Sequence, residues 1–228
     1  MRAMNLVAIE TSTEKGSVAV WSDGVVLRRV CPPGVAHSQT LLPLLCATMS
    51  EAGLAFAALD GVAFAAGPGS FTGLRIACGV AQGLAFAHDL PVVPVGTLDA
   101  MALASGGERV LVLLDARMGE VYCGQFAAAV PLAPPELCHP ATLALPDGAG
   151  WLACGNGLVA YPLLRQRLAA CVQAWQPELM PDADAVARLA APRLARGEGV
   201  DAAAATPLYV RNKVALTVAE RLAVGGKA

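Results

Sequence analysis

The sequence predicts an α/β protein with two lobes, and three observations support this prediction. The chain has 228 residues, which is long for one domain and sufficient for two small ones, because domains cluster near ~100–150 residues. Apolar strands alternate with helical segments along most of the chain. A unit of apolar strand, single acid, glycine-containing turn and second strand occurs near the start and again near the middle.

The first half begins with strands and continues with alternating helices and strands. Residues 6–9, 17–21 and 25–30 are expected strands, and Asp23-Gly24 between the last two is a hairpin signal. A helix is expected from Thr40 to Gly53, a strand at 61–66, a helix ending at His88, a strand at 91–95 and a helix at 97–104. This order indicates a mixed sheet covered by helices.

Ser105-Gly106-Gly107 marks a boundary, so we expect lobes at residues 1–106 and 107–228. The second lobe has expected strands at 110–114, 120–126 and 150–154, a Pro-rich loop at 130–140, and helices near 159–168 and 185–196. A terminal helix at 214–222 could pack back on the first lobe. The two acids of the repeated unit, Glu10 and Asp115, lie 105 positions apart. Duplication of one unit explains this spacing, and chance recurrence of a common motif is the alternative.

Composition excludes several classes of protein. The net charge is −2 without a Lys/Arg cluster, which argues against independent binding to nucleic acid. No stretch reaches the ~18 apolar residues of a membrane span, and no signal peptide is visible, so a cytoplasmic protein is expected. Charged residues are 15% of the chain, against roughly 25% in an average domain. Either drift toward alanine or an apolar surface covered by a partner explains this.

The seven cysteines predict free thiols. Their number is odd, their spacings are irregular, and no CxxC occurs. Small buried thiols in a reducing compartment are the expected state.

The most specific local pattern is a glycine-rich loop, GPGSFTG at residues 67–73, between a strand and a helix. Glycines let a backbone approach a ligand closely, and a helix start offers unpaired N–H groups to an anion. Candidate phosphate contacts are Gly67, Gly69, Ser70 and Gly73, and the first strand end adds Glu10, Thr11 and Ser12, with Asp115 from the repeat. A tight turn capped by Ser70 or Thr72 is the structural alternative, because neither a Walker A loop nor GxGxxG is present.

The acids and histidines limit the chemistry. Glu10 and Asp115 can hold Mg²⁺ or act as bases, or simply cap turns. His37, His88 and His139 form neither HxxxH nor HExxH, so no metal site is predicted. No GxSxG occurs, so a protease is disfavoured.

Two helices show features of a partner surface. In the helix from Thr40, apolar residues cover an arc of roughly 200°, whereas packing on one sheet needs about 100°. In the next helix Gly79 and Gly83 lie four apart, which allows another backbone to come close. The alternative is that both helices are simply deep in a two-layer core.

Five strings together carry a family resemblance: LVAIETS at 6–12, HSQTLLP at 37–43, GPGSFTGLR at 67–75, DARMGEVY at 115–122 and PLYVR at 207–211. With these the chain closely resembles the bacterial TsaB (YeaZ) family, the dimerisation subunit of the tRNA threonylcarbamoyladenosine machinery. The resemblance covers nearly the whole chain. It implies two ribonuclease-H-like lobes in the actin/Hsp70-like ATPase (ASKHA) fold.

The resemblance also implies a function without catalysis by this chain alone. The protein would pair with TsaD, which transfers a threonylcarbamoyl group to adenosine 37 of tRNA, and the small ATPase TsaE would join them. It would form a homodimer when alone and meet tRNA only through the complex. It would have no intrinsic cofactor or metal, with ATP or ADP possible at the junction with its partners.

The family's pairing surface is built from the first two helices. It maps here onto His37, Leu41, Leu42, Leu45, Met49, Ile76, Gly79, Val80 and Gly83. The family usually has Asp where this chain has Glu10, which makes a nucleotide site in this lobe harder to form. An active small-molecule kinase or ATPase of the actin-like superfamily is the alternative function, supported by Glu10, Asp115 and the loop from Gly67.

Overall fold

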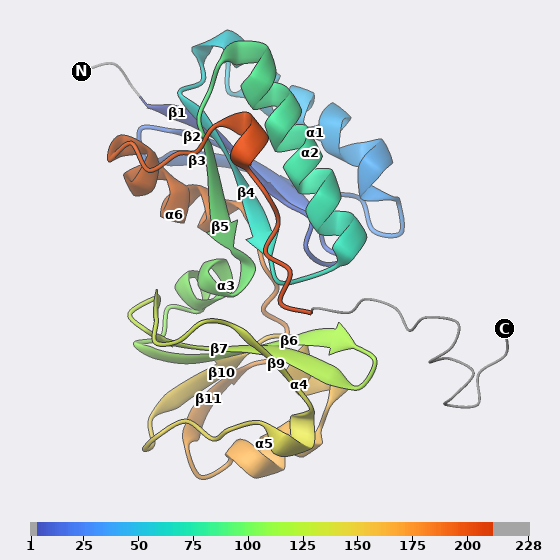
Figure 1. Cartoon of the computed structure of the whole chain (residues 1–228), viewed down its shortest axis with the longest axis vertical. Coiled ribbons are helices and arrows are strands. Elements are labelled where there is room, and N and C mark those ends of the chain that lie inside the picture. Colours follow the sequence, from blue (N-terminus) through green and yellow to red (C-terminus); the bar gives the residue numbers. More distant parts are fainter. Residues whose placement is uncertain (1–3, 212–228) are drawn as a thin grey trace, which may run out of the picture.

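Two β-sheets organise the chain in the computed structural model, which describes residues 4–211 (Figure 1). The first sheet has the strand order β3-β2-β1-β4-β5. Its strands are β1 (Asn5–Glu10), β2 (Ser17–Ser22), β3 (Val25–Val30), β4 (Gly61–Gly67) and β5 (Val92–Gly96). The first three strands are antiparallel, and β4 and β5 run parallel to β1.

The second sheet has the order β11-β10-β6-β7-β8, and β9 also pairs with β7. Its strands are β6 (Arg109–Arg117), β7 (Glu120–Ala127), β8 (Val130–Pro131), β9 (Glu136–Cys138), β10 (Trp151–Cys154) and β11 (Val172–Gln176). The pair β6–β7 is antiparallel, whereas β10 is parallel to both β6 and β11.

Both sheets therefore have the same design. In each, the first strand lies at the centre, pairs antiparallel with the second, and is followed on its other side by two parallel strands. In the second sheet β8 and β9, which both pair with β7, occupy the position that β3 has beside β2 in the first sheet. The two lobes of related topology that the strand–acid–turn–strand repeat predicts are present in this order.

Helices cover both faces of the first sheet. On β1, Val7 and Ile9 pack toward α1 (His37–Glu51) and α2 (Phe71–His88), while Leu6 and Ala8 pack toward α6 (Ala183–Ala195). Alternate residues of a strand point to opposite faces, so a strand covered on both sides must be apolar throughout. This explains why every residue of β1 is buried.

The two lobes exchange helices. The helix α3 (Thr97–Ser105) follows the last strand of the first sheet and lies between the lobes: Leu98, Met101 and Ala102 pack against the second sheet, while Ala100 packs in the core of the first. The helix α6 follows the last strand of the second sheet and packs on the first. Thus the segment predicted as the second lobe, 107–228, supplies a helix to the first lobe. The predicted helix at 214–222 lies outside the described residues.

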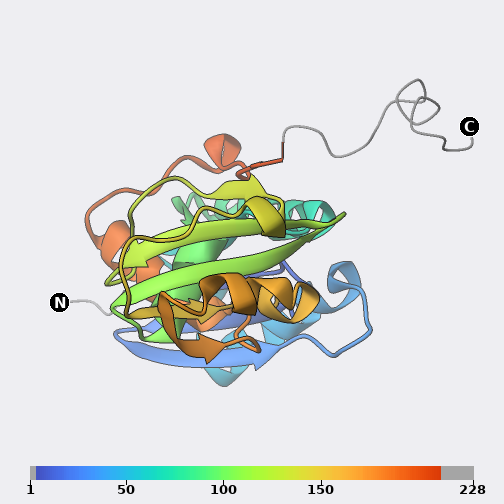
Figure 2. The ribbon, with the colours of Figure 1, turned by 90° about the horizontal axis from the view of Figure 1, so that it is seen from below.

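The outer side of the second sheet carries only short helices, α4 (Gly157–Ala160) and α5 (Leu163–Leu168). Figure 2 shows them from below, on the side away from the first lobe. One helix near 159–168 was predicted, but Pro162 separates two. The loop predicted at 130–140 contains β8 and β9, which are too short to give a sequence signal, and β11 was not predicted.

After α6 the chain returns across the first lobe. Val200 pairs with Val92, and the short 3₁₀ helix η3 (Ala202–Ala204) lies beside α2. Leu208 N–H then donates to Ala66 O at 2.7 Å. We call residues 198–211 the strap, because they run along the first lobe and end at the second (Figure 1). Within the described range, no helix is both long and apolar enough to cross a membrane.

Candidate partner surface and inter-lobe cleft

The glycine-rich loop packs against the first turn of the chain. Ser70 N–H donates to Ser12 O at 2.7 Å, and Thr11 Oγ1 donates to Gly73 O at 2.8 Å. A Cβ on Gly69 would overlap the Ser12 carbonyl, and one on Gly73 would overlap the Thr11 carbonyl. Ser70 caps α2 by accepting from Gly73 N–H. These two glycines therefore serve the contact between two turns, which favours the structural alternative for this loop.

Glu10 ends β1 in an enclosed position. Its side chain is 0% exposed, and Oε1 accepts a hydrogen bond from Ser12 N–H. Oε2 has no hydrogen-bond partner among the described residues. Burial raises the pKa of this carboxyl to about 7, because a charged group loses solvation there. Glu10 does not line the cleft between the lobes.

Asp115 lies near the end of β6 and lines that cleft, but its carboxylate is already engaged. Oδ1 accepts from Tyr161 Oη and from Arg117 N–H, each at 2.9 Å. Oδ2 pairs with the Arg117 guanidinium at 3.2 Å. The structure therefore does not bring Glu10 and Asp115 to one free site. Among residues 4–211, no group of three or more His, Cys, Asp or Glu could hold a metal.

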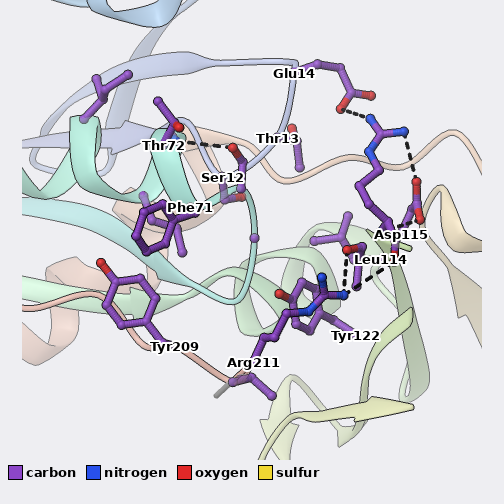
Figure 3. A pocket seen from close by; sticks show the side chains of 18 of the residues that line it. Ser12, Thr13, Glu14, Phe71, Thr72, Leu114, Asp115, Tyr122, Tyr209 and Arg211 are labelled. Carbon is purple, nitrogen blue, oxygen red and sulfur yellow. Dashed lines mark hydrogen bonds and ion pairs between the residues drawn. The ribbon is translucent and has the colours of Figure 1, made fainter. Parts of the chain in front are cut away.

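The cleft has a volume of about 620 Å³ and is lined by both lobes (Figure 3). The first lobe contributes the first turn, the start of α1 and the start of α2, and the second lobe contributes the β6–β7 turn. Arg117 approaches Glu14 of the other lobe at 3.9 Å. Ser12, Gly69, Ser70, Gly73 and Asp115 line this space, while Glu10, Thr11 and Gly67 do not.

The strap closes one side of the cleft, and the contacts of its side chains were not predicted. Arg75 stacks on Phe71, with its guanidinium carbon 3.9 Å from the ring centroid, and donates to Tyr209 Oη at 3.1 Å. Arg211 pairs with Glu120 at 2.7 Å. The sequence signals for this segment were the PLYVR string and a short extended piece expected at 208–210.

The outer surface of α1 and α2 differs from the prediction in part. Leu41, Leu45 and Met49 were assigned to the pairing surface, but each is at most 2% exposed. They lie on the side of α1 that faces the first sheet, and they pack against that sheet. The surface assignment of these three residues is corrected accordingly.

Other predicted positions remain accessible. Leu42, Gly79 and Gly83 are exposed, and Ile76 and Val80 are half-buried. His37 lies at the start of α1, where Nε2 is 2.8 Å from Thr13 O, and it lines the cleft. We use "α1–α2 face" for the exposed positions Leu42, Pro43, Cys46, Gly79, Gly83 and Phe86.

The two lobes share one strand order, each packs against a helix that follows the other lobe's sheet, and a cleft lies between them. These features define an actin/Hsp70-like ATPase fold of paired ribonuclease-H-like units. Residues 32–187 match the family model TsaD, described as tRNA N6-adenosine threonylcarbamoyltransferase. The Escherichia coli (strain K12) "tRNA threonylcarbamoyladenosine biosynthesis protein TsaB" is 35% identical over 93% of this chain and 96% of its own length. The Haemophilus influenzae protein of the same name is 42% identical over 55% of each chain.

A solved structure, "YeaZ from Pseudomonas aeruginosa", is 39% identical, with a TM-score of 0.81 over 90% of this chain and 99% of its own. A second, described as an uncharacterized protein similar to peptidase YeaZ from Pseudomonas aeruginosa, gives a TM-score of 0.83 at 39% identity over 91% of this chain and 100% of its own. The chain belongs to the TsaB (YeaZ) family.

Proposed function

We propose that this chain is a non-catalytic subunit of the tRNA threonylcarbamoyladenosine machinery and that its α1–α2 face pairs with TsaD, the catalytic subunit. The names of the Escherichia coli and Haemophilus influenzae relatives support the pathway. The match to the TsaD family model supports a partner of similar fold.

One observation carries the choice of surface: Gly79 and Gly83 face outward in the middle of α2 without an internal reason to be glycine. A Cβ at either position would meet nothing within 4 Å, and neither has positive φ. Each glycine costs the helix about 1 kcal/mol relative to alanine. A partner backbone that approaches closely needs this space.

Apolar exposure on the same face agrees with this. Phe86 is 86% exposed and Leu42 is 50% exposed. Large aromatic and aliphatic side chains of this kind are typical anchors of protein interfaces. The two glycines leave two outward positions of α2 without a side chain.

The non-catalytic role is supported by the two strand-end acids. A kinase or ATPase of this fold needs carboxylates that face the cleft and are free to bind Mg²⁺ through water. Glu10 is enclosed, and Asp115 is engaged by Tyr161 and Arg117. The geometry therefore supports the partner role better than the kinase alternative.

The proposal extends to the wider assembly. TsaE would join the pair, tRNA would be met only through the complex, and ATP or ADP would bind at the junction with the partners. Without TsaD the α1–α2 face would support a homodimer, because an outward stripe without charged residues in its centre can face a copy of itself. The net charge of −2 favours contact with tRNA through a partner.

The test is reconstitution of tRNA modification from purified subunits with and without this chain. We expect modification to require the chain and Gly83→Leu to abolish both co-purification with TsaD and modification. Ala195→Leu is the matched control, since it adds similar bulk to an exposed position of α6 on the opposite face of the sheet. Full modification without the chain, or with Gly83→Leu, would contradict the proposal.

A further inference from the structure

Two cysteines of the second lobe lie side by side on neighbouring strands. Cys123 on β7 and Cys138 on β9 have their sulfur atoms 3.7 Å apart. In the register Cys123 is opposite Glu136, and Cys138 lies two positions further along β9. Because side chains alternate between faces with a period of two, both thiols point to the same face of the sheet.

Their environments differ in a way that suits a reactive pair. Cys123 is 7% exposed and belongs to the core between the second sheet and α5. Cys138 is only partly buried and ends a strand of three residues that pairs with β7 alone. A disulfide is about 2.0 Å long, so the sulfur atoms must approach by about 1.7 Å. The short edge strand can supply most of this movement.

The contact also makes one thiol more acidic than the other. The contact between the two sulfurs lowers the pKa of Cys138, and the same contact together with burial raises the pKa of Cys123. The thiolate is the reactive form of cysteine. The accessible sulfur is therefore also the one that ionises more readily.

We propose that Cys123 and Cys138 form an oxidative modification site, which hydrogen peroxide converts reversibly into an intramolecular disulfide. The Cys138 thiolate attacks one peroxide oxygen, so that an S–O bond forms and the O–O bond breaks; the leaving hydroxide takes up the proton that the Cys138 thiol had released and becomes water. The Cys123 sulfur then attacks the sulfenic acid at Cys138. The S–S bond forms as the S–O bond breaks, and the Cys123 proton leaves with the hydroxyl as a second water. The two sulfurs together lose two electrons, and the peroxide gains them.

The bond would fix β9 to β7 and close a loop through β8. Cross-linking of this kind restricts the unfolded chain and stabilises the folded one when native geometry is kept. The site lies on the outer side of the second sheet, away from the α1–α2 face. The proposal is therefore independent of the partner role.

The experiment counts free thiols in the full chain after peroxide treatment, denaturation and alkylation. It uses a Cys46→Ser background, because Cys46 is exposed and can form a disulfide between two molecules. We expect peroxide to remove two alkylatable thiols, dithiothreitol to restore both, and peptide mapping to show a Cys123–Cys138 link. The oxidised protein should melt roughly 5–10 °C higher than the reduced one.

Cys138→Ser is the decisive variant, since its position is partly exposed and the fold should tolerate it. In this variant peroxide should form no intramolecular disulfide between the remaining cysteines. An unchanged thiol count in the parent protein, a link between other cysteines, or a loss of two thiols that persists in Cys138→Ser would overturn the proposal. So would a lower melting temperature on oxidation, because the bond would then not fit the native strands.

Discussion

The Arg211 guanidinium lies 2.7 Å from the Glu120 carboxylate and joins the strap to the second lobe. The Arg211 side chain is only 13% exposed, and it also donates to Ala116 O at 3.0 Å. Because the strap is anchored on the first lobe through Leu208 and Tyr209, this one side chain connects both lobes at the end of the described chain.

Arg211→Ala should loosen this connection. Removing the guanidinium breaks the hydrogen bond to Ala116 O and a partly exposed ion pair with Glu120, which together cost about 1–2 kcal/mol. We expect a lower free energy of unfolding and faster hydrogen exchange in the β6–β7 turn, measured by urea unfolding and mass spectrometry. Arg196→Ala is the control, because Arg196 forms only an exposed ion pair with Glu198. Equal protection of the turn in Arg211→Ala and wild type would contradict the role of Arg211 in joining the strap to the second lobe.

The repeated strand–acid–turn–strand unit was sufficient to predict two related lobes, because its apolar strands and glycine-containing turns are local signals. Exchange of α3 and α6 was not predictable in the same way. Their apolar residues, largely alanine in α6 and leucine, methionine and alanine in α3, are compatible with either sheet, and only the tertiary structure decides which sheet they cover. The strands β8 and β9 were not predicted, because two or three residues are too few to show the alternation of apolar and polar side chains that indicates a strand.

The candidate site was predicted in outline and corrected in detail. Gly79 and Gly83 were assigned to the partner surface because two glycines four apart on a helix let another backbone come close, and both are exposed. Leu41, Leu45 and Met49 were misplaced because hydrophobicity cannot distinguish a core residue from an interface residue on the same helix. The strap was missed since Tyr209 and Arg211 act through residues that are distant in sequence.

Replacement by Asp should have different effects at Leu42 and at Leu45: loss of pairing at the first position and loss of the fold at the second. Leu42→Asp places a charge at a half-exposed position of the α1–α2 face, so the fold should survive and pairing with TsaD or with a second copy should be lost. Leu45→Asp buries a charge at a fully enclosed position and should cost more than about 4 kcal/mol. Circular dichroism and light scattering separate the two effects. A folded Leu45→Asp protein, or a Leu42→Asp protein that pairs normally, would contradict this assignment.

Glycines of the same helix should also differ. Gly73→Ala forces a methyl group into the Thr11 carbonyl, and overpacking of this kind costs about 1–3 kcal/mol. Gly83→Ala meets open space and should stabilise the isolated chain by about 1 kcal/mol. Denaturant unfolding measures both, and a stabilising Gly73→Ala would show that the two turns do not pack as described.

Glu10 should make stability depend on pH. Its pKa is raised from 4.5 to about 7 in the folded chain. Between these values the folded state holds a proton that the unfolded state has released, so the free energy of unfolding falls as pH rises. The fall is about 3 kcal/mol and is complete above pH ~7. In Glu10→Gln this contribution disappears, because the amide stays neutral and can still accept the Ser12 N–H bond.

The measurement is urea unfolding of wild type and Glu10→Gln at several pH values from about 4.5 to 8. The difference between the two free energies should change in favour of the variant as pH rises, and should be constant above neutrality. Glu14→Gln is the matched control, since it removes an exposed carboxyl from the same turn and leaves the buried one in place. A difference between wild type and Glu10→Gln that does not vary with pH would mean that Glu10 is solvated or has a partner that neutralises it.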